Sequence, residues 1–144
     1  MTDFEKAIAF VLKWEGGYVD NPADPGGETN FGISKRSYPS FDIKNLTEEQ
    51  AKAIYRRDYW EKMGCNALPW PMNLVVFDTS VNMGCSKAAE IRVSANDDWR
   101  EYLLYRVSHY VKLAAKPSMS QFLRGWLNRV MDLWRIAREP AFEL

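Results

Sequence analysis

A pair of adjacent glycines, Gly16-Gly17, ends the first helical pattern of this chain. Apolar residues recur at helical spacing from Thr2 to Trp14, and glycine readily adopts the positive φ that ends a helix. The spacing therefore predicts a helix whose last turn carries Glu15, followed at once by a polar loop. A carboxylate at this position lies at the negative end of the helix dipole, which disfavours its charged form.

The remaining chain is also helical in pattern, except for residues 16–46, which are rich in Gly, Pro, Asp and Asn. Short extended pieces or a small hairpin are expected near Phe31 to Ser34. Thr2 with Glu5 and Thr47 with Gln50 match the capping-box pattern that begins a helix. Ser86 and Asp97 are expected to cap two later helices, and Phe122 and Trp134 are expected to face the core from the last one. The further helices are expected to begin near residues 47, 72, 86, 97 and 120 and to end near 63, 84, 93, 114 and 138.

Length and composition favour one folded domain. The chain has 144 residues, of which 47% are hydrophobic, so a sizeable core can form and a disordered chain is excluded. The formal net charge is zero, which argues against nucleic acid as a partner. From Trp99 onward, however, eight basic residues accompany four acidic ones. This basic part either faces an anionic polymer or is a solvated helix face.

The chain offers no recognisable metal site or targeting segment. Cys65 and Cys85 form no metal-ligand pattern with the single histidine, so no metal is expected and two buried free thiols are favoured over a disulfide. The N-terminus lacks the features of a signal peptide, and no segment approaches the roughly 20 apolar residues of a membrane span. We therefore expect a cytoplasmic product without membrane insertion.

Glu15 is the first candidate for chemistry. Trp14 and Tyr18 beside it can exclude water, and this adds to the effect of the helix dipole in favouring a protonated carboxyl group. A general acid needs that protonated form near neutral pH. The alternative interpretation is an ordinary surface glutamate in a last helical turn.

The loop after Glu15 supplies further candidates. Asp24 lies between Pro22 and Pro25, and Thr29 follows five residues later. A glutamate, a loop carboxylate and a hydroxyl can together protonate a leaving oxygen and position a water molecule. Asp24 is equally compatible with a turn-forming role. Glu28 is a third carboxylate that competes for either role.

Farther along the chain, Asp78 and Asn82 lie one helical turn apart. They either line a cleft or bond to neighbouring backbone groups. In the loop, Gly26, Gly27 and Gly32 permit close backbone approach to a ligand. They do not form a nucleotide-binding pattern, because neither GxGxxG nor GxxxxGK is present.

Several segments of the chain form a recognisable set: Glu15-Gly16-Gly17-Tyr18, Asn21-Pro22, Asp24-Pro25-Gly26-Gly27-Glu28-Thr29-Asn30-Phe31-Gly32-Ile33, Tyr59-Trp60, Leu68-Pro69, Phe77-Asp78, Asn82-Met83-Gly84 and residues 122–130. This set resembles the N-acetylmuramidases of glycoside hydrolase family 108, some of which are labelled secretion activator proteins and many of which are phage or prophage endolysins. The resemblance covers nearly the whole chain.

This resemblance implies a mainly α, lysozyme-like single domain over residues 1–144, with about six helices and a long Gly/Pro-rich loop or small hairpin after the first. Residues 1–83 would form the half with the catalytic motif. Residues 84–144 would form a helical half that resembles a reduced peptidoglycan-binding region. In this half the Asp-Gly turn and the Gly-x-x-Thr segment of many relatives are missing, which puts wall binding in doubt.

The resemblance also implies the reaction, which is cleavage of the β-1,4 bond between N-acetylmuramic acid and N-acetylglucosamine in peptidoglycan. It assigns the catalytic role to Glu15. The spacing to Asp24 and Thr29 is similar to the Glu-x8-Asp-x5-Thr triad of other phage-type lysozymes, with the last gap one residue short, so Asn30 competes with Thr29. The expected substrate-binding residues are Tyr18, Glu28, Asn30, Phe31, Asp78 and Asn82.

No cofactor is needed for such hydrolysis. The resemblance further implies a monomer that acts on the cell wall after its release from the cytoplasm. A holin pore would provide a route for that release. Two other functions stay open: a lytic transglycosylase that acts on the same bond, and a non-catalytic secretion or cell-wall interaction protein.

Overall fold

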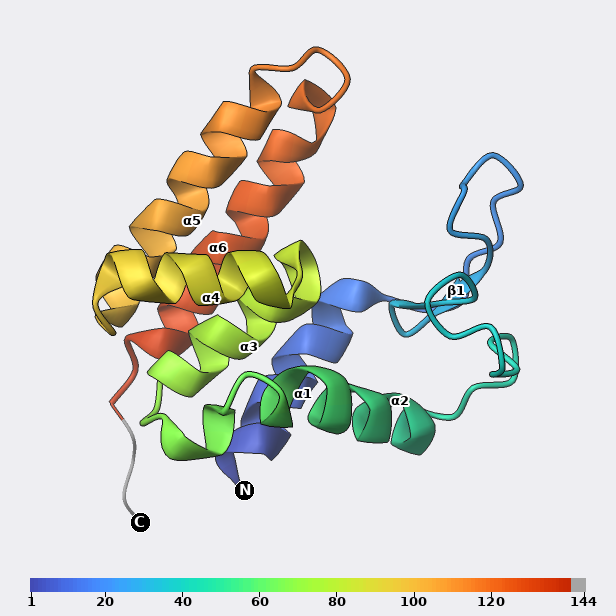
Figure 1. Ribbon diagram of the computed structural model, residues 1–144, viewed down its shortest axis with the longest axis horizontal. Helices are drawn as coiled ribbons and strands as arrows, with labels where there is room; N and C mark the ends of the chain where they lie inside the picture. Colours follow the sequence, from blue (N-terminus) through green and yellow to red (C-terminus); the bar gives the residue numbers. More distant parts are fainter. Residues whose placement is uncertain (141–144) are drawn as a thin grey trace. The chain divides into compact units, whose positions relative to one another are not determined.

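The computed structural model describes residues 1–140 of the chain (Figure 1). In these residues it contains six α-helices and one small hairpin, which confirms the expected mainly α class. The chain divides into two compact units, residues 1–58 and residues from Tyr59 onward. The single domain over 1–144 and its division at residue 83 stay predictions.

The first unit begins with helix α1 (Asp3–Glu15). The expected capping box is present: the backbone N–H of Glu5 donates to Thr2 Oγ1 at 3.1 Å, and the backbone N–H of Thr2 donates to Glu5 Oε2 at 2.7 Å. Gly16 ends the helix with a φ of 74°. The prediction that a positive-φ glycine stops the helix just after Glu15 is therefore confirmed.

A hairpin follows the loop, formed by β1 (Thr29–Asn30) and β2 (Ile33–Ser34) in antiparallel pairing. Its two-residue turn has positive φ at both positions, 51° at Phe31 and 78° at Gly32. Such turns match the right-handed twist of the paired strands. The hairpin was expected near Phe31 to Ser34. Val19 also pairs with Thr29 on the other side, which was not predicted, so residues 19–34 form a small meander.

Helix α2 (Glu48–Tyr55) completes the first unit. Thr47 and Gln50 form the second expected capping box, in which Gln50 N–H donates to Thr47 Oγ1 at 3.1 Å. The helix continues as a π-helical turn over Arg56–Glu61. The largest buried apolar side chains of this unit are Phe4, Ile8, Phe10, Val11, Ile33, Ile43, Leu46, Ile54 and Tyr55.

The second unit is built around helix α3 (Met72–Met83), in which the nine consecutive residues 72–80 are buried. A helix buried on all sides is a core element rather than an amphipathic surface helix. Three helices follow: α4 (Cys85–Ala95), α5 (Trp99–Ala114) and α6 (Leu123–Ala137). Each packs against the helix that precedes it in the chain, and α5 and α6 run side by side (Figure 1). Within residues 1–140, the chain has no helix that is both long and apolar enough to cross a membrane.

Three local expectations for the second unit are wrong. Asp98 caps α5 instead of Asp97, because its carboxylate accepts the backbone N–H of Arg100 at 2.9 Å. Ser86 lies inside α4 and does not cap it, since that helix begins at Cys85. Phe122 and Trp134 do not face the core but are 46% and 36% exposed.

Candidate active site

Glu15 is half-buried and is the last residue of α1. The hairpin turn lies against its side chain at Gly32. A Cβ atom added to Gly32 would lie 2.6 Å from Glu15 Oε2 and 2.8 Å from Glu15 Cβ, closer than any side chain can approach. The sequence indicated that Gly32 allows close backbone approach to a ligand; the structure shows that the approach is to Glu15.

Tyr55 holds the same turn from the other side. Its hydroxyl donates a hydrogen bond to the carbonyl oxygen of Phe31 at 2.7 Å, and it would lie 2.6 Å from a Cβ atom at Gly32. The ring is buried in the core of the unit. The carboxylate of Glu15 and the hydroxyl of Tyr55 therefore flank one glycine. Sequence reasoning placed Tyr55 on a helix but had no signal for this role.

Phe31 has an unusual backbone conformation. Its φ of 51° lies in the left-handed region, which bulky side chains rarely occupy. Strained conformations of this kind persist only where neighbouring contacts fix them, and they cluster at functional sites. Here the hydrogen bond from Tyr55 fixes the Phe31 carbonyl. The strain is located at the turn that covers Glu15.

Asp24 lies at the exposed tip of the loop between α1 and β1. Its Oδ1 accepts the backbone N–H of Gly26 at 2.8 Å, and its backbone carbonyl accepts that of Gly27 at 3.1 Å. This arrangement is the turn-forming role, which is one of the two roles that the sequence allows for Asp24; the other is catalytic. The turn fixes the side chain and leaves the carboxylate exposed to solvent.

Glu28 is tied to Tyr18 at the base of this loop. The Tyr18 hydroxyl donates to Glu28 Oε2 at 2.7 Å, and this hydrogen bond to a carboxylate raises the pKa of Tyr18 to about 12. The neighbouring residues Val19 and Thr29 exchange two backbone hydrogen bonds of 2.9 and 2.8 Å. Both ends of the loop are therefore fixed, and the half-buried Thr29 side chain projects from a rigid strand.

Asn30 has a structural environment. It is buried, and its Nδ2 donates to the carbonyl oxygens of Ile43 and Lys44 at 3.1 and 3.4 Å. These bonds tie the hairpin to the segment before α2. The amide nitrogen is thus engaged within the protein, so the expected sugar contact of Asn30 stays a prediction without support from its side-chain position.

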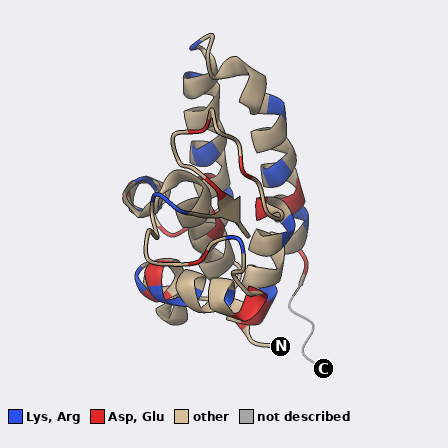
Figure 2. Ribbon diagram, turned by 90° about the vertical axis from the view of Figure 1, so that its right-hand side faces the viewer, with Lys and Arg blue, Asp and Glu red and all other residues tan. Residues whose placement is uncertain are grey.

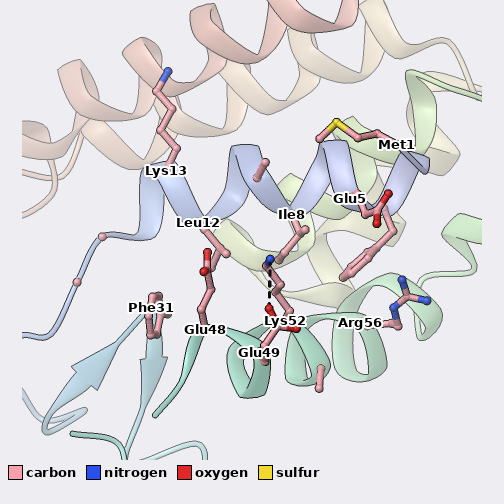
Figure 3. Close-up of a pocket in the computed structure, with 15 residues that line it drawn as sticks. Met1, Glu5, Ile8, Leu12, Lys13, Phe31, Glu48, Glu49, Lys52 and Arg56 are labelled. Carbon is pink, nitrogen blue, oxygen red and sulfur yellow. Dashed lines mark ion pairs between the residues drawn. The ribbon is translucent and has the colours of Figure 1, made fainter. Parts of the chain in front are cut away.

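A groove of about 1100 Å³ runs between α1 and α2 (Figure 3). Its apolar lining includes Ile8, Leu12 and Phe31, and its charged lining includes acidic and basic side chains from both helices. Lys52 and Glu49 form an ion pair of 3.6 Å across one turn of α2. Gly16 and Gly17, which directly follow Glu15 in the chain, also line the groove. A mixed polar and apolar groove of this size suits an extended polar ligand.

The second unit holds the remaining two expected site residues. Asp78 is fully buried, and its two oxygens accept hydrogen bonds of 2.7 Å from Arg106 Nη1 and Arg129 Nη2. Burial alone would raise the pKa of Asp78, but the two guanidinium groups outweigh it and hold the pKa below its ordinary value. Asn82 accepts a hydrogen bond from the Tyr110 hydroxyl. Asp78 thus has a structural environment, and its expected contact with substrate has no support from this position.

Residues 8–84, more than half of the chain, match the family described as Glycosyl hydrolase 108. Among solved structures, the chain is similar to SagA of Brucella abortus, with a TM-score of 0.76 and 25% identity over 96% of this chain and 98% of that chain. No curated protein sequence matches. The likeness over nearly the full length of both chains confirms the expected lysozyme-like fold. Because this family match covers more than half of the chain, the chain belongs to glycosyl hydrolase family 108.

Proposed function

We propose that this protein is a muramidase that hydrolyses peptidoglycan at the β-1,4 bond between N-acetylmuramic acid and N-acetylglucosamine, with Glu15 as the general acid. Membership of a glycosyl hydrolase family supports this reaction class. The observation that carries the assignment of the acid is the position of Glu15, half-buried at the negative end of α1 beneath the Phe31-Gly32 turn. Its carboxylate is held against a turn whose residue Phe31 lines the groove between α1 and α2.

In the proposed reaction, the Glu15 carboxyl group gives its proton to the glycosidic oxygen while the bond from that oxygen to the muramic acid C1 breaks. A water molecule then bonds to C1 and loses a proton. Asp24 accepts that proton or stabilises the positive charge that develops on the sugar, and the Thr29 hydroxyl positions the water. The fixed, exposed carboxylate of Asp24 supports its part.

Sugar contacts are proposed for Tyr18, Glu28 and Phe31. Tyr18 is 40% exposed beside the loop, and Phe31 lines the groove between α1 and α2. Aromatic rings of this kind can pack against the apolar face of a sugar. The groove would then hold part of the glycan strand or its peptide.

The central test compares Glu15→Gln with Glu61→Gln, an exposed glutamate that does not line the groove. Activity is measured as the fall in turbidity of chloroform-treated Gram-negative cells. We expect Glu15→Gln to lose about 100-fold or more, which is the usual contribution of a general acid, and Glu61→Gln to keep most activity. A folded Glu15→Gln variant with full activity would overturn the mechanism.

Mass spectrometry of digested peptidoglycan then identifies the products. A reducing muramic acid end indicates hydrolysis, whereas a 1,6-anhydro end indicates a lytic transglycosylase. Complete absence of lysis by the folded wild type would favour a non-catalytic interaction protein.

The wider biological role follows the resemblance to phage and prophage endolysins. We infer that the chain is made in the cytoplasm as a monomer and reaches the wall through a holin pore. Induced expression with and without a holin in the same cells tests this. Lysis that depends on the holin supports the inference, and equal lysis in both strains contradicts it.

A further inference from the structure

An apolar groove of about 330 Å³ lies between α5 and α6 in the second unit. We call it the α5–α6 groove, and nothing in the proposed reaction uses it. Its principal lining residues are Leu104, Val107, Met131, Trp134, Arg135 and Arg138.

Large apolar side chains of this groove are exposed to water. Leu104 is 61% exposed, Met131 is 48% exposed and Trp134 is 36% exposed. Leaving them in water forgoes the free energy of burying apolar surface. Exposed apolar patches that are rimmed by charged residues mark interaction surfaces.

The charged residues that line the groove are both basic. Its charged lining residues are Arg135 and Arg138, with no acidic residue among the described lining. Arg100 adds a third guanidinium group, since it lies 4.6 Å above the Trp99 ring, which itself is 4.9 Å from the Trp134 ring. Acidic as well as basic residues occur along α5 and α6 (Figure 2), but from Trp99 onward the basic residues outnumber the acidic ones by eight to four. Because the whole chain has a net charge of zero, this positive charge is local.

These features together match the surface of a lipid bilayer. Tryptophan favours the membrane–water interface, and arginine can place its apolar stem among lipid chains while its head binds a phosphate. Apolar side chains beside basic ones are typical of structures that lie on an anionic membrane. A second copy of this chain fits less well, because a symmetric contact would place the arginines of each copy against those of the other.

We propose that the α5–α6 groove binds the surface of a bilayer that contains anionic phospholipid. The contact is peripheral: Leu104, Met131 and Trp134 enter the interface, and Arg100, Arg135 and Arg138 bind headgroup phosphates. The proposal is independent of the hydrolytic reaction, because Glu15 takes no part in it.

Co-sedimentation with vesicles tests the proposal, using the full chain and vesicles of phosphatidylethanolamine and phosphatidylglycerol. Vesicles of phosphatidylcholine alone are the neutral comparison. We expect binding to the anionic vesicles that weakens as salt is added and little binding to the neutral ones. Equal binding to both compositions, or no binding to either, would overturn the proposal. The vesicles contain no peptidoglycan, so this result is separate from the outcome for hydrolysis.

Two pairs of variants locate the surface. Arg135→Gln with Arg138→Gln is expected to weaken vesicle binding about fivefold for each arginine removed. Lys44→Gln with Lys62→Gln makes the same change in net charge at exposed sites elsewhere and is expected to leave binding unchanged. An equal loss in both double variants would show non-specific attraction and would overturn the proposed site.

The apolar side chains have their own comparison. Leu104→Ser with Met131→Ser is expected to reduce binding, while Val93→Ser, at an 83% exposed position on α4, is not. Circular dichroism confirms that each variant is folded. If the groove variants instead change the oligomeric state in analytical ultracentrifugation and leave vesicle binding intact, the groove joins copies of the chain and the proposal is wrong.

Discussion

Gly32 lies directly against Glu15, with only 2.6 Å between Glu15 Oε2 and the position that a Cβ atom of Gly32 would occupy. A side chain at position 32 would therefore displace the Glu15 carboxylate, and only a glycine lets the turn lie this close to it. Gly32 also needs its left-handed φ of 78° to form the turn. Both the turn and the orientation of Glu15 depend on the same missing Cβ atom.

Gly32→Ala should therefore reduce lytic activity by more than its loss of folding stability explains. The left-handed backbone costs an alanine roughly 1–2 kcal/mol, and the added methyl group must push Glu15 or Tyr55 aside. We expect lysis to fall by an order of magnitude or more, about tenfold per 1.4 kcal/mol lost in the transition state. Denaturant unfolding and the turbidity assay measure the two effects separately.

Gly27→Ala provides a matched control, since Gly27 has a similar φ of 73° but its Cβ atom would lie 3.7 Å from Lys35 Cβ, an ordinary contact. It should show the backbone cost and little loss of activity. Equal losses of activity in both variants would contradict a specific contact between Gly32 and Glu15.

Tyr55→Phe removes the hydroxyl that holds the Phe31 carbonyl. The carbonyl loses its partner, so the free energy of unfolding should fall by about 1–3 kcal/mol. Because the turn also positions Glu15, kcat should fall by a larger factor than KM rises. Tyr38→Phe, which removes a 2.6 Å hydrogen bond to Asp58 Oδ2, is the control for the loss of a tyrosine hydroxyl. A change in stability alone would limit Tyr55 to a structural role.

Asp24→Asn separates the two roles of the loop carboxylate. The asparagine Oδ1 can still accept the N–H of Gly26, so the turn should persist while the charge is lost. We expect activity to fall by about 100-fold with unchanged unfolding, as for the loss of a general base. Glu28→Gln, which keeps an acceptor for Tyr18, tests the competing carboxylate in the same assay. Full activity of Asp24→Asn would leave Asp24 as a turn former only.

The local features of the fold could be predicted from the sequence because their signals are local. The Thr2 and Thr47 capping boxes depend on residues three positions apart, and Gly16 ends α1 through its own φ. The contact of Gly32 with Glu15 could not be predicted, since it joins two segments whose approach depends on the hairpin. The role of Tyr55 depends on the same long-range arrangement.

Helix α6 shows a second limit. The buried stripe passes through Val130, Leu133 and Ala137. Trp134 is therefore turned by one residue, about 100°, from the core-facing position that the helical spacing predicted. Helical spacing defines a stripe but not its exact rotation, which depends on packing against α5. The misassigned residue is part of the α5–α6 groove.

Asp78 lies at the centre of the second unit, where its single carboxylate faces two guanidinium groups. Arg106 is fully buried, and its Nη2 has no hydrogen-bond partner in the described structure. Because two guanidinium groups face one carboxylate, the site carries an excess of positive charge. From the sequence, a structural role for Asp78 is slightly favoured over a place in a cleft. Its complete burial favours the structural role.

Asp78→Asn should therefore destabilise the protein by about 3–5 kcal/mol, because it leaves two buried charges without a counter-ion. Glu90→Gln, which breaks an exposed pair with Lys87, should cost less than about 1 kcal/mol. Since the pKa of Asp78 in the folded protein is below its ordinary value of 3.8, its stabilising effect is fully present above that pH and is lost as the pH falls further. The wild type should thus exceed Asp78→Asn in unfolding free energy from neutral pH to about pH 4, and the difference should narrow below it. Urea unfolding across this range measures the difference, and narrowing that begins near neutral pH would contradict a lowered pKa.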